Sequence, residues 1–120
     1  MRKLLAHLAL AALSGWSLAC ATSNSSTTRA VSQAELAVSE AATSEAAALA
    51  PEDLQLARSK LAQAEQAARS GNQERARRLA EQALVDAQLA EVKAESEAAR
   101  LSAREVETRI DGFQRTLIVR

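Results

Sequence analysis

Aromatic residues are nearly absent from this chain, which has only Trp16 and Phe113 and no tyrosine. Hydrophobic residues make up 48% of the sequence, but many of them are alanines, which bury little area each. A thick globular core is therefore excluded, whereas narrow seams between helices can be built. Alanine, leucine, glutamate, glutamine and arginine dominate after residue 30, and this composition is typical of long helices or coiled coils.

The chain also lacks the residues that most sites need. It has one cysteine, Cys20, and one histidine, His7, so an internal disulfide is excluded. The formal net charge of zero gives no reason to expect nucleic acid as a partner. The sequence contains no nucleophile–base pair, no glycine-rich phosphate loop and no cluster with metal-ligand spacing. We therefore expect no enzyme, no metal, no cofactor and no small-molecule substrate.

The first residues have the anatomy of an export signal. Arg2 and Lys3 precede the apolar run of residues 4–13, and small residues follow before Cys20. A membrane-spanning helix needs about 18 consecutive apolar residues, and this run is shorter. We predict that residues 1–19 are a secretory signal peptide.

Leu18, Ala19 and Cys20 resemble the lipobox of bacterial lipoproteins. The resemblance implies that Cys20 becomes an acylated mature N-terminus, which anchors the chain to a membrane. Ala21 stands where an aspartate would be the familiar inner-membrane retention signal, so the resemblance favours the outer membrane, with the protein facing the periplasm. Ordinary signal cleavage nearby and an unprocessed signal anchor are the alternatives.

After the cysteine the pattern changes twice. Residues 20–29 are polar and rich in serine and threonine without apolar periodicity, which predicts a disordered tether. From Ala30 onward, alanines and valines recur at steps of three and four, which predicts a short amphipathic helix over about residues 30–48. The helical domain as a whole is expected over residues 30–110.

A long antiparallel hairpin should follow, giving an all-α fold with coiled-coil-like packing. Pro51 suits the first turn of a helix over about residues 51–69. Gly71 and Asn72 suit a tight turn, after which a third helix should run over about residues 73–110. The short turn folds the third helix back on the second.

The third helix has apolar residues at positions two apart, such as Ala83 and Val85. Such positions point about 200° from each other, so the helix carries two apolar stripes on nearly opposite faces. One stripe is alanine-rich and should pack on the second helix. We expect the hairpin seam to consist of Leu54, Leu61, Leu79, Ala83 and Ala87. The other stripe needs the first helix, another subunit or a partner. We expect this interaction face to consist of Val85, Leu89, Val92, Val106 and Ile110.

The last ten residues, 111–120, form an apolar tail whose structure the sequence leaves open. Asp111 and Gly112 are a turn signal, and the residues after them are apolar and β-prone. Folding back on the bundle, pairing as a strand and contacting a partner are the alternatives.

Residues from about 40 to 95 resemble a bacterial family described only as a domain of unknown function. The pattern combines an Ala-Pro helix start, a glycine-containing turn and alanine–leucine heptads. The matching residues are Ala50, Pro51, Leu54, Gly71, Ala76, Arg77, Leu79, Ala80, Ala83, Asp86, Ala87, Leu89 and Ala90. The resemblance implies an envelope lipoprotein or exported protein. Some members of the family carry an outer-membrane-protein-A-like domain after the long helix.

These observations lead to one functional expectation and one rival. We expect a non-enzymatic outer-membrane lipoprotein that acts as a periplasmic structural or adaptor coiled coil, with a homo-oligomer or another envelope protein as its partner. The alternative is a monomeric helical module that binds a peptide or ligand in the periplasm.

Overall fold

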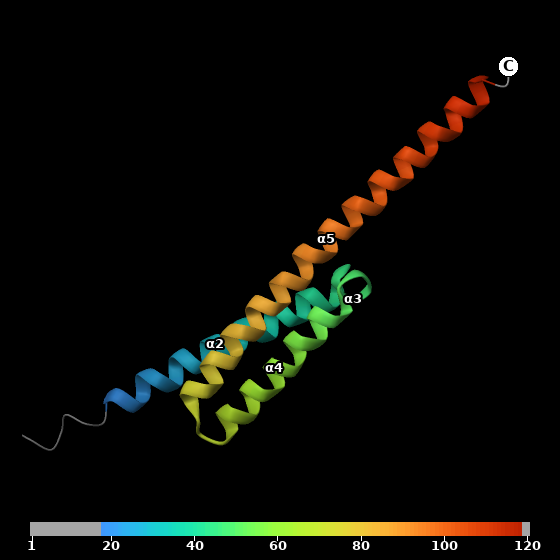
Figure 1. The fold of residues 1–120 in the computed structure, drawn as a ribbon. Coiled ribbons are helices and arrows are strands. Elements are labelled where there is room, and N and C mark those ends of the chain that lie inside the picture. Colours follow the sequence, from blue (N-terminus) through green and yellow to red (C-terminus); the bar gives the residue numbers. More distant parts are fainter. Residues whose placement is uncertain (1–17, 119–120) are drawn as a thin grey trace, which may run out of the picture.

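The computed structural model describes residues 18–118, with side chains from Asn24 onward. These residues form four helices: α2 (Leu18–Thr43), α3 (Ala46–Leu49), α4 (Pro51–Arg69) and α5 (Gln73–Ile118). The structure confirms the all-α class and the hairpin of two long helices. Figure 1 shows α2 and α4 packed along the first half of α5, while the second half of α5 projects beyond them.

The turn between α4 and α5 follows from two residues. Gly71 has a φ of 81°, in the left-handed region that glycine enters without steric cost. The amide of Asn72 donates to the Ala67 carbonyl at 2.9 Å and that of Gly71 to Ala68 at 3.0 Å, the Schellman pattern that ends a helix. The Asn72 side-chain oxygen then accepts from the Arg75 amide at 3.2 Å and caps α5. Both expected roles are confirmed.

Two ion pairs set the register of the hairpin. Lys60 Nζ lies 2.6 Å from Asp86 Oδ2, and Lys93 Nζ lies 2.7 Å from Asp53 Oδ1. The spacing from Asp86 to Lys93 along α5 equals the spacing from Lys60 back to Asp53 along α4. This matched spacing is possible only where α4 and α5 run antiparallel.

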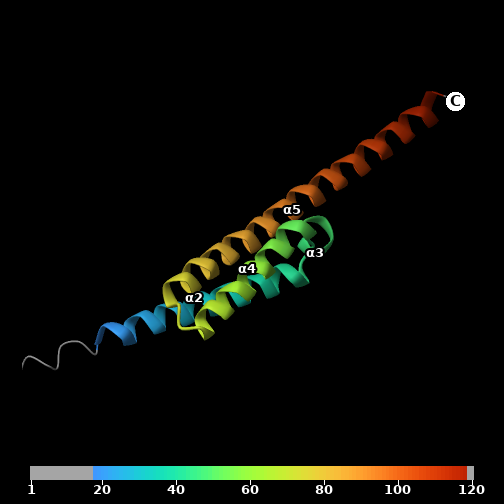
Figure 2. The same ribbon diagram turned by 60° about the horizontal axis from the view of Figure 1, so that its bottom comes forward.

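The third member of the bundle, α2, runs parallel to α5. Near its start the Thr27 hydroxyl donates to the Gln73 carbonyl at 3.2 Å, where α5 begins. Further along, Ala34 packs with Ala80 and Ala83. The view of Figure 2 shows the same arrangement after rotation, with α2 and α4 on neighbouring flanks of α5.

Alanine forms most of the core between these helices. We call the buried alanines of α5 the inner alanine row, and each is at most 1% exposed. The row consists of Ala76, Ala80, Ala83, Ala87, Ala90 and Ala94. It packs in two clusters against residues of α2, α3 and α4, with Leu54 as the largest buried side chain opposite it. Small side chains let three helices approach closely without a thick core.

The first helix differs from the prediction in extent and in continuity. The helix expected over residues 30–48 is interrupted, because α2 ends at Thr43 and α3 begins at Ala46. The Ser44 hydroxyl donates to the Ala41 carbonyl at 3.0 Å and accepts from the Ala46 amide at 3.1 Å. Serine side chains compete in this way with backbone hydrogen bonds of a helix, and the break follows.

The disordered tether expected over residues 20–29 is instead helical in the structure, as part of α2. Thr27 is only 3% exposed and contacts the start of α5, whereas Asn24, Ser25, Ser26, Thr28 and Arg29 are exposed. The Thr28 hydroxyl donates to the Asn24 carbonyl at 2.9 Å within the helix. Composition alone did not reveal this long-range contact of Thr27.

The end of α5 also differs from the prediction. The helix was expected to stop near residue 110, but it continues to Ile118, through Gly112. One glycine inside a helix costs only about 1 kcal/mol relative to alanine, which is too little to end a helix with good formers around it. Every residue from 99 to 118 is exposed, so this segment, which we call the arm, does not fold back on the bundle.

The two glycines predict opposite effects of one substitution. Gly71→Ala should lower the free energy of unfolding by about 1–2 kcal/mol, because alanine is strained at positive φ. Gly112→Ala should stabilise the arm by about 1 kcal/mol, because it lies in a helix with no other group near the added methyl. Urea unfolding measures the first effect, and amide hydrogen exchange over the arm measures the second. A stabilising Gly71→Ala variant would contradict the turn geometry.

Close packing in the bundle predicts that a larger side chain at a buried alanine position destabilises the fold. Ala64 is fully buried, and Ala64→Leu should lower the free energy of unfolding by about 1–3 kcal/mol through overpacking. The neighbouring Gln63 is exposed, so Gln63→Leu is the matched control and should change stability little. Equal effects of the two variants in urea unfolding would mean that the helices are not closely packed at Ala64.

Candidate interaction surface

The outer face of α5 carries a line of mostly apolar residues along most of the helix. We call it the outer seam, and its positions alternate by four and three residues, as in a heptad repeat. It consists of Val85, Leu89, Val92, Ser96, Ala99, Ala103, Val106, Ile110, Phe113 and Leu117. Ser96 is its one polar position, and every position is exposed.

The exposure of the large side chains makes this surface unusual. Val85 is 60% exposed, Val106 55%, Ile110 49% and Phe113 73%. Monomeric soluble proteins rarely leave a contiguous apolar surface of this kind uncovered, and such surfaces mark interaction sites. The outer seam is therefore the strongest candidate site among the described residues.

All five residues of the expected interaction face lie on the outer seam and are exposed. The first helix, one of the three covers considered for this face, does not cover it. Helix α2 packs instead on the inner alanine row, where Ala34 and Ala41 are fully buried. Both neighbours of α5 therefore lie on the same side of it, and its outer side stays open.

The expected hairpin seam lies inside the bundle. The structure places Leu54 and Ala87 in one buried cluster and Ala83 in the other. Leu61 packs against both clusters, and Leu79 packs against the second. Leu61 and Leu79 are only partly buried, so they close the edges of the core.

Two residues of the outer seam lie beyond residue 110, where the third helix was expected to end. Phe113 and Leu117 continue the alternation of four and three beyond Ile110 and stay on the same face. The spacing itself was the available signal, but Asp111-Gly112 was interpreted as a turn. The arm therefore presents four large apolar side chains on its seam.

Charged residues flank the bundle half of the seam unevenly. On the α4 side, Asp86 and Lys93 are engaged by the ion pairs to α4. On the opposite side, Glu91 and Glu95 line a shallow hollow together with Glu45, close to the end of α2. This second flank is acidic, with no basic side chain lining that hollow.

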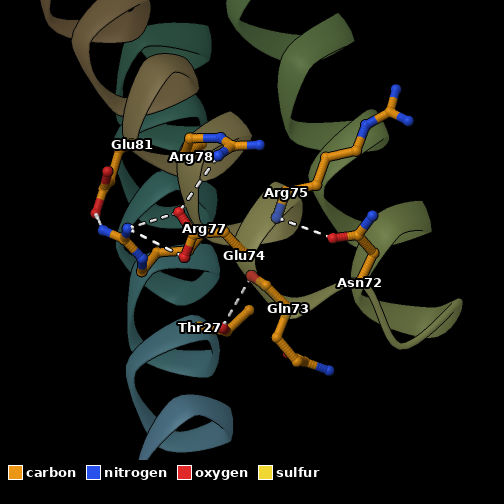
Figure 3. Close-up of polar contacts among 8 residues, drawn as sticks. All are labelled: Thr27, Asn72, Gln73, Glu74, Arg75, Arg77, Arg78 and Glu81. Carbon is orange, nitrogen blue, oxygen red and sulfur yellow. Dashed lines mark hydrogen bonds and ion pairs between the residues drawn. The ribbon is translucent and has the colours of Figure 1, made fainter.

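The start of α5 carries a compact polar cluster, drawn in Figure 3. Arg77 lies 3.1 Å from Glu74 and 2.7 Å from Glu81, and these carboxylates raise its pKa through hydrogen bonds and charge. Arg78 also pairs with Glu74, whereas the Arg75 side chain points away from the cluster (Figure 3). Solvent screens these surface pairs, so they contribute little to stability and act as helix-surface ion pairs.

The expected lipidation site and signal peptide lie at the limit of what the structure describes. Cys20 falls near the start of α2, but its side chain and residues 1–17 lie outside the described part. Among the described residues, no helix is both long and apolar enough to cross a bilayer. The same residues contain no group of His, Cys, Asp or Glu side chains arranged to hold a metal ion.

The described geometry defines the class of the protein: a three-helix bundle with a projecting helix, whose exposed feature is an apolar seam. Residues 29–106 match the family described as "Domain of unknown function (DUF4398)". The match covers more than half of the chain, and the chain belongs to this family. Comparison with curated proteins finds no match, and comparison with solved structures finds none either.

Proposed function

We propose that this protein is a non-enzymatic lipoprotein of the outer membrane, anchored through Cys20 and facing the periplasm, which acts as a structural or adaptor coiled coil. Support for the anchor comes from the sequence: a charged start, a short apolar run and a cysteine after small residues. Each buried methylene of an acyl chain contributes about 0.8 kcal/mol, so two or more chains hold a protein stably.

The observation that carries the working role is the exposed outer seam. An amphipathic helix ordinarily buries its apolar stripe, but none of residues 18–118 covers the stripe of the arm. The described residues offer side chains for packing and no constellation for catalysis. A protein of this kind acts by holding another helix.

The positions of the two ends fit this role. Helix α2 begins at one end of the elongated molecule and the arm ends at the other, in both Figure 1 and Figure 2. With 46 residues, α5 is about 70 Å long, at 1.5 Å per residue. An anchor at Cys20 therefore lies at the opposite end of the chain from the tip of the seam.

The anchor is tested by the intact mass of the protein purified from membranes of its native cells. We expect a chain that begins at Cys20 and carries added acyl mass. A Cys20→Ala variant is the control and should lose both the acyl mass and membrane attachment. A native chain that begins elsewhere without acyl chains would overturn the lipoprotein assignment, and a retained Trp16 would indicate a signal anchor.

The packing role is tested by charge on the seam. Replacing both Val92 and Val106 by glutamate should abolish self-association or partner capture, measured by sedimentation and by cross-linking in membranes. Both side chains are more than half exposed, so the bundle should stay folded. The control places glutamate at Leu101 and Thr108, which lie on the opposite face of the arm. Unchanged association after the Val92 and Val106 changes would refute the role of the seam.

A further inference from the structure

The outer seam has a symmetry that indicates what covers it. Its ten positions are centred on Leu101, with small residues in the middle and large ones at both ends. We propose that a second copy of this chain packs antiparallel along the seam. The two-fold axis crosses the seam at the height of Leu101 along the helix. The inference rests on the proposed packing role of the seam and names its occupant.

In this arrangement each position of the outer seam packs against one position of the outer seam of the other copy. The pairs are Val85 with Leu117, Leu89 with Phe113, Val92 with Ile110, Ser96 with Val106, and Ala99 with Ala103. The alanine layers at the centre let the two helices approach closely, and the larger side chains fill the space toward both ends. The seam is used over its full length by both copies.

The distribution of branched residues disfavours a parallel pair. Parallel two-stranded coiled coils prefer β-branched residues at the first core position of the heptad and leucine at the second. Here Val85, Val92 and Val106 occupy the second position and Leu89 and Leu117 the first, which is the reverse; of the large seam residues at the first position, Ile110 alone follows the preference. An antiparallel pair mixes the two positions in every layer, so each valine packs against a residue from the first position of the other copy.

Charge complementarity favours the same orientation. Residues 85–98 contain four acidic side chains and one basic one, whereas residues 99–118 contain four basic and three acidic ones. The antiparallel pair sets each basic arm against the acidic bundle half of the other copy. A parallel pair would place the acidic halves beside each other.

Individual flanking residues follow this pattern. Arg109 of the second copy comes beside Glu95 on the acidic flank. Glu107 of the second copy comes beside Lys93, whose ammonium also lies 2.7 Å from Asp53. Both contacts occur twice by symmetry. The one like-charge contact is Arg100 with its own copy across the axis, and Glu97, 3.6 Å from Arg100, offsets it. A parallel pair offers only the contact of Glu95 with Arg100.

The bundle leaves this position free. Helices α2 and α4 pack on the inner alanine row, so the arm of a second copy can lie on the outer face beside Val85, Leu89 and Val92. Pairing would bury the apolar side chains of the arm, which are exposed in the single chain, and would stabilise it. The two Cys20 residues then lie at opposite ends of the pair, so both reach one bilayer only when the pair lies along it.

Cross-linking from single cysteines distinguishes the orientations. The full chain with Cys20→Ser, purified in mild detergent, receives Ser102→Cys or Ser96→Cys and is treated with a short bis-maleimide. In the antiparallel pair the two Ser102 positions face each other across the axis. The two Ser96 positions lie about 15 Å apart along it, beyond a short linker. Leu101→Cys is the control for chance encounters, because it points away from the seam.

We expect Ser102→Cys to give a covalent dimer, and Ser96→Cys to give no more dimer than Leu101→Cys. Sedimentation of the Cys20→Ser chain should give twice the chain's 12.7 kDa. Efficient linking at Ser96 with none at Ser102 would overturn the orientation, and a monomer by sedimentation would overturn the second copy as occupant. These chains carry no lipid, so the results are independent of the anchor, which the intact mass of the native protein tests.

Discussion

Close packing of alanine against alanine is the constraint on which the rest of this structure depends. The inner alanine row is buried along the first half of α5, and α2 and α4 both pack on it. Each alanine contributes little buried area, so the row must be long and continuous to hold three helices together. This requirement explains why the bundle is narrow, why a few leucines at its edges suffice, and why ion pairs between α4 and α5 add to its register.

The same row leaves the opposite side of α5 free. Two neighbours on one flank of a helix cannot also cover a stripe that points about 200° away. The apolar residues of that stripe continue at heptad spacing from the bundle into the arm, which the described part of the chain leaves exposed. Helix α5 therefore belongs to the folded bundle over its first half and carries an exposed apolar surface along its outer side. This arrangement supports the proposed role in assembly.

The acidic flank and the basic arm give that surface a direction. Charges along an exposed coiled-coil edge contribute little to affinity individually, but they decide which orientation and partner are favoured. The polar cluster at the start of α5 has a different role, because its arginines and glutamates neutralise one another within one helix.

The sequence by itself determined the helical class, the bounds of α4, the start of α5 and the two stripes of α5, because proline, glycine and heptad spacing act locally. Composition did not show that residues 20–29 are helical or that Thr27 packs against the start of α5, a contact between residues far apart in the sequence. The turn signal at Asp111-Gly112 was overridden for a local reason, because one glycine costs too little to end a helix with good formers on both sides. The alanine stripe was expected to pack on the second helix, but the sequence left open whether the first helix covers the other stripe. Only the tertiary structure decided this. Since α2 packs on the alanines together with α4, where small side chains allow the closest approach, the valine- and leucine-rich seam stays exposed.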